Sequence, residues 1–248
     1  MKRFHVPPGT LDADNVQLDG AVAHRMSRVL RLRAGDEAAL FDGDGFEARV
    51  RLDAVDDRAV TATVLERYEG LAEPLVKVSL YQSITKGERF DWLLEKGTEI
   101  GVARFVPLIT ARSVIKPSDG SARVDRWHRI VVEAAEQCGR TVVPKVDAPV
   151  RIDDALAAAT GVVIVPYEAA GEMALDVQRA LNADIDALFA LSEVSIFIGP
   201  EGGFEEAEIE RATAAGAVLV TMGRRVLRSE TAGLVAATLV LQAAGELG

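Results

Sequence analysis

Cysteine is almost absent from the chain, and aromatic side chains are scarce. Cys138 is the only cysteine in 248 residues, and the three histidines, His5, His24 and His128, are scattered. A single cysteine closes no internal disulfide, which excludes a secreted fold held together by disulfides. The histidines have no cysteine partners, so we expect no structural zinc site and no bound metal. Because Phe, Trp and Tyr make up only 5% of the residues, aliphatic side chains must fill the core.

Long hydrophobic runs are missing as well. No window of about 18 residues is apolar throughout, so no transmembrane helix is predicted. The first ten residues, MKRFHVPPGT, are polar and lead into an Asp-rich stretch, which is not the pattern of a signal peptide. We therefore expect a soluble protein of the cytoplasm.

The composition that remains is that of a globular protein, with 49% hydrophobic and 27% charged residues. Its length suits one large domain or two small ones. The first 70 residues predict a short helix at 20–31 and strands at 36–43, 45–53 and 58–68, separated by Asp-rich turns. Such a segment is typical of a small β-barrel or sandwich. Gly70 and Pro74 mark a linker, so we expect one domain over 1–72 and a second over 73–248.

Beyond residue 74, apolar strands alternate with helices. This alternation predicts an α/β fold with a mostly parallel sheet that helices cover on both faces. The expected strands are 76–84, 103–110, 161–167, 193–200 and 217–223, and the expected helices are 87–100, 123–139, 205–216 and 230–246.

Charge is distributed unevenly along the chain. The net charge of −10 argues against a nucleic-acid partner, but residues 24–33 contain four arginines and no acid. Residues 104–151 contain nine Lys and Arg against five Asp and Glu, whereas 152–210 contain one Arg against thirteen acids. Binding follows local patches of charge and solubility follows the net charge. The basic stretches therefore suit either a surface that binds RNA or a solvated face.

Two glycine-containing segments follow predicted strands. IFIGPEGGF, at 196–204, lies at the carboxyl end of a strand, where open α/β sheets bind ligands. It matches neither a dinucleotide fingerprint nor a P-loop, and an ordinary strand-to-helix turn remains the alternative. In MGRRVLRSETAG, at 222–233, three arginines precede a helix that Ser229 or Thr231 can cap. Arg228 is placed to bind an anion there, or the arginines merely solvate a loop.

Two further segments carry clustered polar residues. TKGERFDWLLEKGTEIGV, at 85–102, is typical of a charged helix face with i,i+4 ion pairs. EAAEQCGR, at 133–140, ends a helix, and Cys138 there is expected to pack as a small buried residue. Nothing in the sequence places a histidine beside that thiol, as nucleophilic catalysis requires.

Together these four segments, in this order, resemble the RsmE-type 16S ribosomal RNA methyltransferases of the SPOUT class. The N-terminal stretch HRMSRVLRLRAGDEAALFDGDG is similar to the small PUA-like RNA-binding barrel of that family. The resemblance implies an α/β, SPOUT-type knotted parallel-sheet methyltransferase domain with a C-terminal trefoil knot, preceded by a small PUA-like β-barrel. Ala111 stands where the family often has Glu.

The resemblance also implies an activity. It is transfer of a methyl group from S-adenosyl-L-methionine to N3 of uridine 1498 of 16S rRNA, with the assembled small ribosomal subunit as the expected substrate. The implied enzyme is a homodimer that needs neither a metal nor a membrane. Two alternatives stay open: a SPOUT methyltransferase that acts on another RNA, and a non-catalytic RNA-binding assembly protein on the same fold.

Site residues carry over from the matching motifs. Arg228 is the candidate for stabilising negative charge on the uracil, and the base is either Glu230 or Glu201. The implied cofactor-binding residues are Pro166, Tyr167, Glu168, Gly199, Pro200, Gly202, Gly203, Met222, Gly223, Val226, Leu227 and Thr231. The implied RNA-binding residues are Arg25, Arg28, Arg31, Arg33, Lys86, Arg112 and Arg140.

Overall fold

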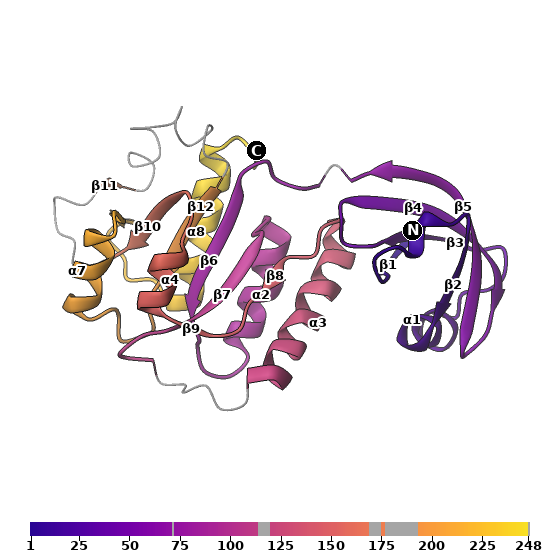
Figure 1. Ribbon diagram of the computed structural model, residues 1–248, viewed down its shortest axis with the longest axis horizontal. Coiled ribbons are helices and arrows are strands. Elements are labelled where there is room, and N and C mark those ends of the chain that lie inside the picture. The colour runs from indigo at the N-terminus through magenta and orange to yellow at the C-terminus, as the bar shows by residue number, and fades with distance from the viewer. Residues whose placement is uncertain (71, 114–119, 169–174, 177–192, 248) are drawn as a thin grey trace. The chain divides into compact units, whose positions relative to one another are not determined.

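The described residues form two compact units. The computed structural model describes residues 1–70, 72–113, 120–168, 175–176 and 193–247. Unit 1 comprises Met1–Glu73 and Val132–Val143, and unit 2 comprises Pro74–Val131 and Pro144–Gly248. The elements of both units are labelled in Figure 1. Among the described residues, no helix is long and apolar enough to cross a membrane.

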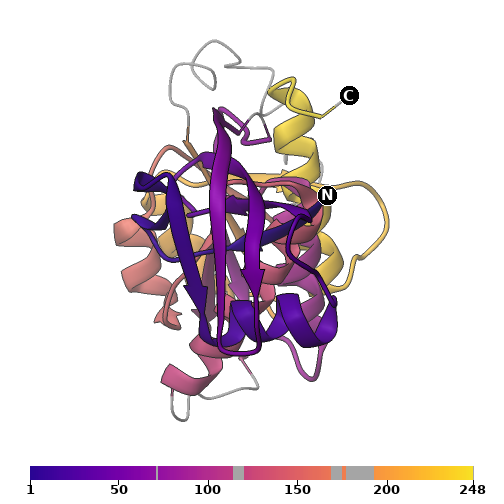
Figure 2. The same cartoon turned by 90° about the vertical axis from the view of Figure 1, so that its right-hand side faces the viewer.

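Unit 1 is built on a five-stranded sheet, which faces the viewer in Figure 2. The strands lie in the order β1, β3, β4, β5, β2; β1 pairs with β3 in parallel, and the other neighbours are antiparallel. The strands β3, β4 and β5 confirm the predicted β-rich segment, whereas the sequence pattern does not predict β1 and β2. The bounds are Lys2–His5 for β1, Asn15–Asp19 for β2, Glu37–Phe41 for β3, Phe46–Val55 for β4 and Ala59–Glu69 for β5.

The helix expected at 20–31 is present in two parts. α1 spans Gly20–His24 and continues as a π-helical turn over Arg25–Val29. It packs beside β2 and β5, with the side chains of Ala23 and Met26 fully buried. The rest of the core of unit 1 is mainly aliphatic, as the scarcity of aromatic residues requires.

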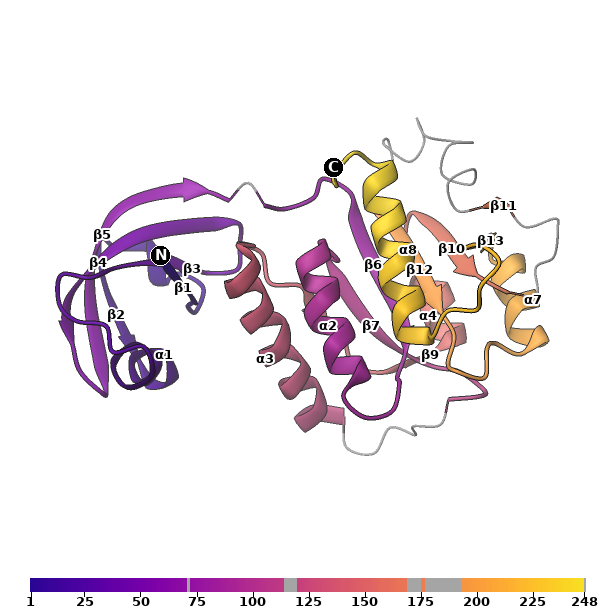
Figure 3. The same cartoon turned by 180° about the vertical axis from the view of Figure 1, so that it is seen from behind.

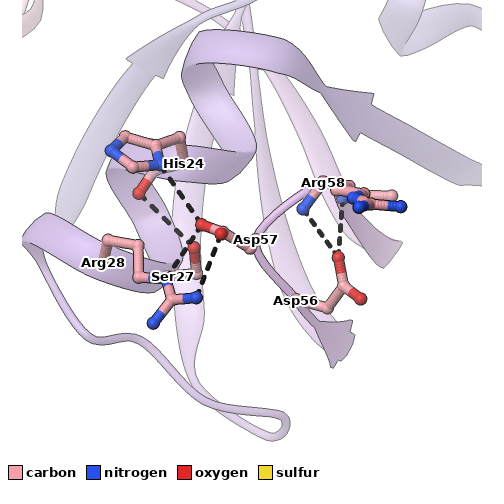
Figure 4. A network of polar contacts seen from close by, with 7 residues as sticks. His24, Ser27, Arg28, Asp56, Asp57 and Arg58 are labelled. Atoms are coloured by element: carbon pink, nitrogen blue, oxygen red, sulfur yellow. Dashed lines mark hydrogen bonds and ion pairs between the residues drawn. The ribbon is translucent and has the colours of Figure 1, made fainter.

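Polar contacts fasten this helix to the turn between β4 and β5 (Figure 4). Arg28 donates from Nε and Nη2 to the two carboxylate oxygens of Asp57, at 2.9 and 3.0 Å. His24 Nδ1 lies 3.2 Å from Asp57 Oδ1. The hydrogen bond from Arg28 lowers the pKa of Asp57. Asp56 turns away to accept from the backbone N–H of Arg58, which lowers the pKa of Asp56.

Two partly buried carboxylates bind residues 132–143 into unit 1. Glu136 accepts from the backbone N–H of His5 at 2.8 Å and from the guanidinium of Arg25 at 2.6 Å. Glu73 accepts from Arg140 at 2.8 Å and from the backbone N–H of Thr141 at 3.1 Å. The sequence-based division at 72–73 assigned this segment to the second domain. These long-range ion pairs and hydrogen bonds place it with the first instead.

Unit 2 contains an eight-stranded parallel sheet, which confirms the predicted α/β class. The strand order is β11, β13, β10, β12, β6, β7, β8, and β9 also pairs with β7. The strands are β6 (Lys77–Ser83), β7 (Arg104–Ile109), β8 (Lys145–Val146), β9 (Val150–Arg151), β10 (Val162–Pro166), β11 (Leu175–Asp176), β12 (Glu193–Ile198) and β13 (Val218–Thr221).

Helices cover both faces of this sheet. Figures 1 and 3 show α2 (Arg89–Ile100) and α8 (Ser229–Ala243) on one face and α4 (Ile152–Ala158) and α7 (Glu206–Ala214) on the other. The remaining helix, α3, spans Gly120–Cys138. All four predicted helices are present, and among the helices of unit 2 that the structure describes only the short α4 has no counterpart in the prediction. Tyr81 and Phe197 stack at 4.3 Å inside the sheet's core.

Candidate ligand pocket at the ends of parallel strands

A pocket of about 420 Å³ lies at the carboxyl ends of β10, β12 and β13. Open parallel sheets bind ligands at this edge, because the loops that follow the strands converge there. The wall is formed by the loops after these three strands, by the first turn of α8 and by Arg112, which follows β7. The lining residues are Arg112, Pro166, Tyr167, Glu168, Ile198, Gly199, Pro200, Glu201, Gly202, Gly203, Phe204, Val220, Thr221, Met222, Gly223, Arg225, Val226, Leu227, Arg228, Ser229 and Ala232.

Glycines determine the backbone conformation of the two pocket loops that follow β12 and β13. Gly203 and Gly223 have φ of +69° and +102°, a region that other residues rarely adopt. A Cβ at either position would meet nothing within 4 Å, so the backbone there borders open space. A Cβ at Gly199 would instead press on the ring of Phe204 at 3.2 Å. Bare backbone is therefore accessible to a ligand along both loops.

A buried hydrogen-bonded chain connects this pocket to the sheet and to α8. Gln82, which has no exposed surface, donates from Nε2 to Oγ of Ser229 at 2.8 Å. Ser229 Oγ in turn donates to the carbonyl of Gly199 at 2.5 Å. The sequence suggested that Ser229 or Thr231 caps α8. In the structure Arg228 is the N-cap residue, and the Ser229 hydroxyl is used by the pocket loop instead.

A second clamp holds the glycine loop from the other side. The carboxylate of Glu208, which is only 2% exposed, accepts from the backbone N–H of Ala111 at 2.8 Å and of Glu205 at 2.9 Å. Arg112 donates to the carbonyl of Gly202 at 2.8 Å. Glu208 is not among the predicted site residues, because in sequence it is one acid of a charged helix. Its two N–H partners come from different loops.

The two candidate bases lie on either side of one guanidinium. Nη1 of Arg89 is 3.4 Å from Oε1 of Glu201, and its Nε is 3.7 Å from Oε1 of Glu230. The Glu201 side chain is 37% exposed and lines the pocket, whereas the Glu230 side chain is 8% exposed and does not. Oε2 of Glu230 is buried and has no hydrogen-bond partner among the described residues.

The structure brings most of the predicted site residues together. Every predicted cofactor-binding residue except Thr231, which is half-buried in α8, lines the pocket, as do Arg228 and Glu201. The sequence missed several lining residues: Ile198, Phe204, Val220, Thr221, Arg225, Ser229 and Ala232. Their position in the sequence, within or next to the two glycine loops, is the feature by which they could have been predicted.

The predicted RNA-binding residues are divided between the two units. Arg112 lines the pocket and Lys86 is exposed in unit 2, while Arg28, Arg31 and Arg33 are exposed in unit 1. Arg25 pairs with Glu136, and its guanidinium lies over the ring of Phe4. Arg140 is only 3% exposed and binds Glu73, so the surface contact predicted for Arg140 is wrong in this structure.

No metal-ligand cluster is found in the part of the chain that the structure describes: no group of three or more His, Cys, Asp or Glu is placed to hold an ion.

Family comparisons agree with this architecture. Residues 72–241 match the family model of an RNA methyltransferase domain, and residues 18–65 match that of an RNA methyltransferase PUA domain. The parallel sheet, the pocket at its strand ends and the small β unit thus define a SPOUT-type RNA methyltransferase with a PUA-like domain.

Relatives with a known name identify the family within this class of protein. Ribosomal RNA small subunit methyltransferase E of Bacillus subtilis is 34% identical over 236 residues, 92% of this chain and 90% of the relative. The protein of the same name from a Synechocystis species is 35% identical, over 94% of this chain and 75% of the relative. The chain therefore belongs to the ribosomal RNA small subunit methyltransferase E family, as its motifs indicated.

Solved structures show the same fold. The crystal structure of ribosomal RNA small subunit methyltransferase E from Neisseria gonorrhoeae, bound to S-adenosyl methionine, matches with a TM-score of 0.86 and 31% identity, over 98% of this chain and 97% of that one. A putative methyltransferase from Legionella pneumophila, in complex with the same cofactor, matches with a TM-score of 0.84 and 28% identity, over 97% of both chains.

Proposed function

We propose that the pocket binds S-adenosylmethionine and that the protein methylates N3 of uridine 1498 of 16S rRNA in the small ribosomal subunit. The observation that carries this proposal is the pocket cradled by the glycine loops of Gly199–Gly203 and Met222–Arg228. The names of the relatives and the cofactor held by two solved neighbours support it.

The lining of the pocket fits this cofactor. A volume of about 420 Å³ is within the usual range for small-ligand sites. Ile198, Val220 and Leu227 offer apolar walls to an adenine ring, and the loops with bare backbone offer amides and carbonyls to its polar edges. Glu168 and Glu201 bring carboxylates to a ligand that carries positive charge. We assign cofactor contacts to the predicted residues that line the pocket, and we omit Thr231.

Bound there, S-adenosylmethionine supplies an electrophilic methyl group. The task of the protein is then to orient the acceptor and to manage its proton. If the N3–H of uracil has a pKa about two units above ambient pH, its deprotonation costs ~3 kcal/mol. Arg228, exposed at the pocket rim, stabilises the negative charge that develops on the base, and Glu230 or Glu201 receives the proton. Much of the remaining rate comes from holding the two reactants in line.

The exposed arginines of unit 1 and the cations of unit 2 suit contacts with RNA phosphates. Such contacts set the position of the RNA and do not read its bases. We assign this role to Arg28, Arg31, Arg33, Lys86 and Arg112. Arg25 and Arg140 are left out because each is paired with a partly buried carboxylate of unit 1.

The remaining features of the family are part of the same proposal. They are two domains divided near residues 72–73, with residues 132–143 packed on the first, a C-terminal trefoil knot in the second, a homodimer, and a cytoplasmic location with the ribosomal substrate. The strand order supports the knot, because β13 lies between β10 and β11 while α8, which follows β13, packs on β6 and β12.

A methylation assay tests the proposal. Purified protein and tritiated S-adenosylmethionine are incubated with small ribosomal subunits from a strain that lacks this enzyme, and the RNA is digested for mass spectrometry. We expect label as N3-methyluridine at one site of 16S rRNA, and a large loss of rate in Arg228→Ala. Label in another RNA would point to a different substrate. Binding of the cofactor without any transfer would point to an assembly protein on the same fold.

A further inference from the structure

Arg89 links three elements that the sequence keeps far apart. It is the first residue of α2, Glu201 lies in the glycine loop after β12, and Glu230 lies in the first turn of α8. The nitrogen–oxygen distances of 3.4 and 3.7 Å are those of loose ion pairs. One guanidinium thus stands between the carboxylates of the two candidate bases.

This arrangement differs from an ordinary surface ion pair. The Glu230 side chain is 8% exposed, and burial of a carboxylate is costly unless it is well paired. Its Oε1 lies 3.7 Å from Nε of Arg89, and its Oε2 has no hydrogen-bond partner among the described residues. This geometry does little to stabilise the folded protein. Oε2 of Glu230, which can accept a proton, has no partner among the described residues.

Arg89 also has donors to spare. A guanidinium carries five N–H donors, and the two carboxylates face only Nε and Nη1. The side chain is 45% exposed, so its remaining donors are accessible to a ligand. Arg89 does not line the cofactor pocket, whereas its partner Glu201 does. The guanidinium therefore lies beside the pocket and is partly open to solvent.

We propose that Arg89 is a catalytic residue on the acceptor side: held by Glu201 and Glu230, it donates to a carbonyl oxygen of the target uracil as N3 loses its proton. This inference rests on the proposed function. The N3 proton passes to one of the two carboxylates that hold Arg89 and then to water. The bond between N3 and the methyl carbon forms as the bond from that carbon to sulfur breaks, and sulfur keeps the electron pair. Positive charge on Arg89 stabilises the deprotonated uracil, as oxyanion donors do in other enzymes.

The first test is Arg89→Gln in the methylation assay at pH 7. We expect kcat to fall about 10²-fold, the scale of losing one donor to a developing anion. Calorimetric affinity for S-adenosylmethionine should change less than about 3-fold, because Arg89 does not line that pocket. Arg89→Lys should recover part of kcat. Lys96→Gln is the matched control, since it removes a cation that pairs with Glu95 and Glu99 on the same helix, and it should leave kcat unchanged.

A pH series separates this role from a structural one. At higher pH the N3 proton of uracil dissociates without help, so the ratio of wild-type to Arg89→Gln rates should shrink from pH 7 to pH 9. The double variant Arg89→Gln/Glu201→Gln should stay as slow as Arg89→Gln. Recovery in the double variant would mean that Arg89 only neutralises Glu201.

The outcomes distinguish this inference from the proposed function. If the wild-type protein makes no N3-methyluridine in any RNA, both fail. If the wild type makes it and Arg89→Gln either matches its rate or is slowed equally at all pH values, the role of Arg89 alone is overturned.

Discussion

The phenol of Tyr68 donates a hydrogen bond of 2.5 Å to Oε1 of Glu47, which is 4% exposed. Partial burial and this hydrogen bond raise the pKa of Tyr68 from 10.0 to about 12. A raised pKa favours the protonated phenol in the folded state. Its contribution to stability is therefore complete below pH 10 and is lost as the pH rises towards 12.

Between pH 10 and 12, we expect the free energy of unfolding to fall less in Tyr68→Phe than in the wild type, because the variant has no phenol at this position. Urea denaturation of both proteins between pH 8 and 12 measures it, and absorbance at 295 nm follows the phenol itself. The difference titration between the two proteins should have its midpoint near pH 12. A midpoint near the ordinary value of 10.0 would contradict the expectation.

Ser229 is the second residue for which we predict an effect on stability. Ser229→Ala removes the shortest hydrogen bond of the buried Gln82 amide and the donor to the half-buried Gly199 carbonyl. We expect a loss of about 1–3 kcal/mol in the free energy of unfolding, measured in urea. Ser27→Ala is the control, because the Ser27 hydroxyl makes only an exposed contact of 3.4 Å. Equal effects of the two substitutions would mean that the buried chain stabilises nothing.

At the scale of elements, α8 approaches the sheet closely at Gly233. A Cβ at this position would collide with Oε1 of Gln82 and come within 3.2 Å of Leu93 and 3.4 Å of Leu80. Gly233→Ala should therefore destabilise unit 2 by about 1–3 kcal/mol, although alanine favours helix, because the contact overpacks the interface. The exposed control Gln242→Ala should stay within about 0.5 kcal/mol in the same urea titration.

The helix α2 shows which contacts sequence periodicity predicts and which it does not. The sequence predicts a charged helix with ion pairs along one face, and Lys96 does pair with Glu99 three residues on. Arg89 instead pairs out of the helix, with Glu201 and Glu230. Spacing within a helix predicts contacts at i+3 and i+4. It carries no information about which loop lies beside the first turn.

At the scale of the whole molecule, Glu73 holds two distant parts of unit 1 together. Its carboxylate accepts from the guanidinium of Arg140 and from the backbone N–H groups of Thr141 and Val142. Glu73→Ala takes this partner from a guanidinium that is 3% exposed. We expect unit 1 to lose about 3–5 kcal/mol, the cost of breaking a buried ion pair.

Because that loss falls on one unit, unfolding of Glu73→Ala should separate into two steps. Unit 1 melts first, and S-adenosylmethionine, which we assign to unit 2, should raise only the second transition. Glu66→Gln is the control: its pair with Arg49 spans 3.4 Å between exposed side chains and should contribute less than about 1 kcal/mol. A single cooperative transition in Glu73→Ala would contradict independent stability of the two units.

The sequence by itself determined the β-rich start, the later alternation of strands and helices, and the glycine loops after β12 and β13. These follow from local periodicity and from backbone conformations that only glycine adopts readily. Only the tertiary structure decided the strand order, which places β6 between β12 and β7, and the inclusion of residues 132–143 in unit 1. It also decided that Glu208 clamps two loops and that Arg89 stands between Glu201 and Glu230. Such contacts join residues many positions apart, and they arise from packing of whole elements, which local pattern does not encode.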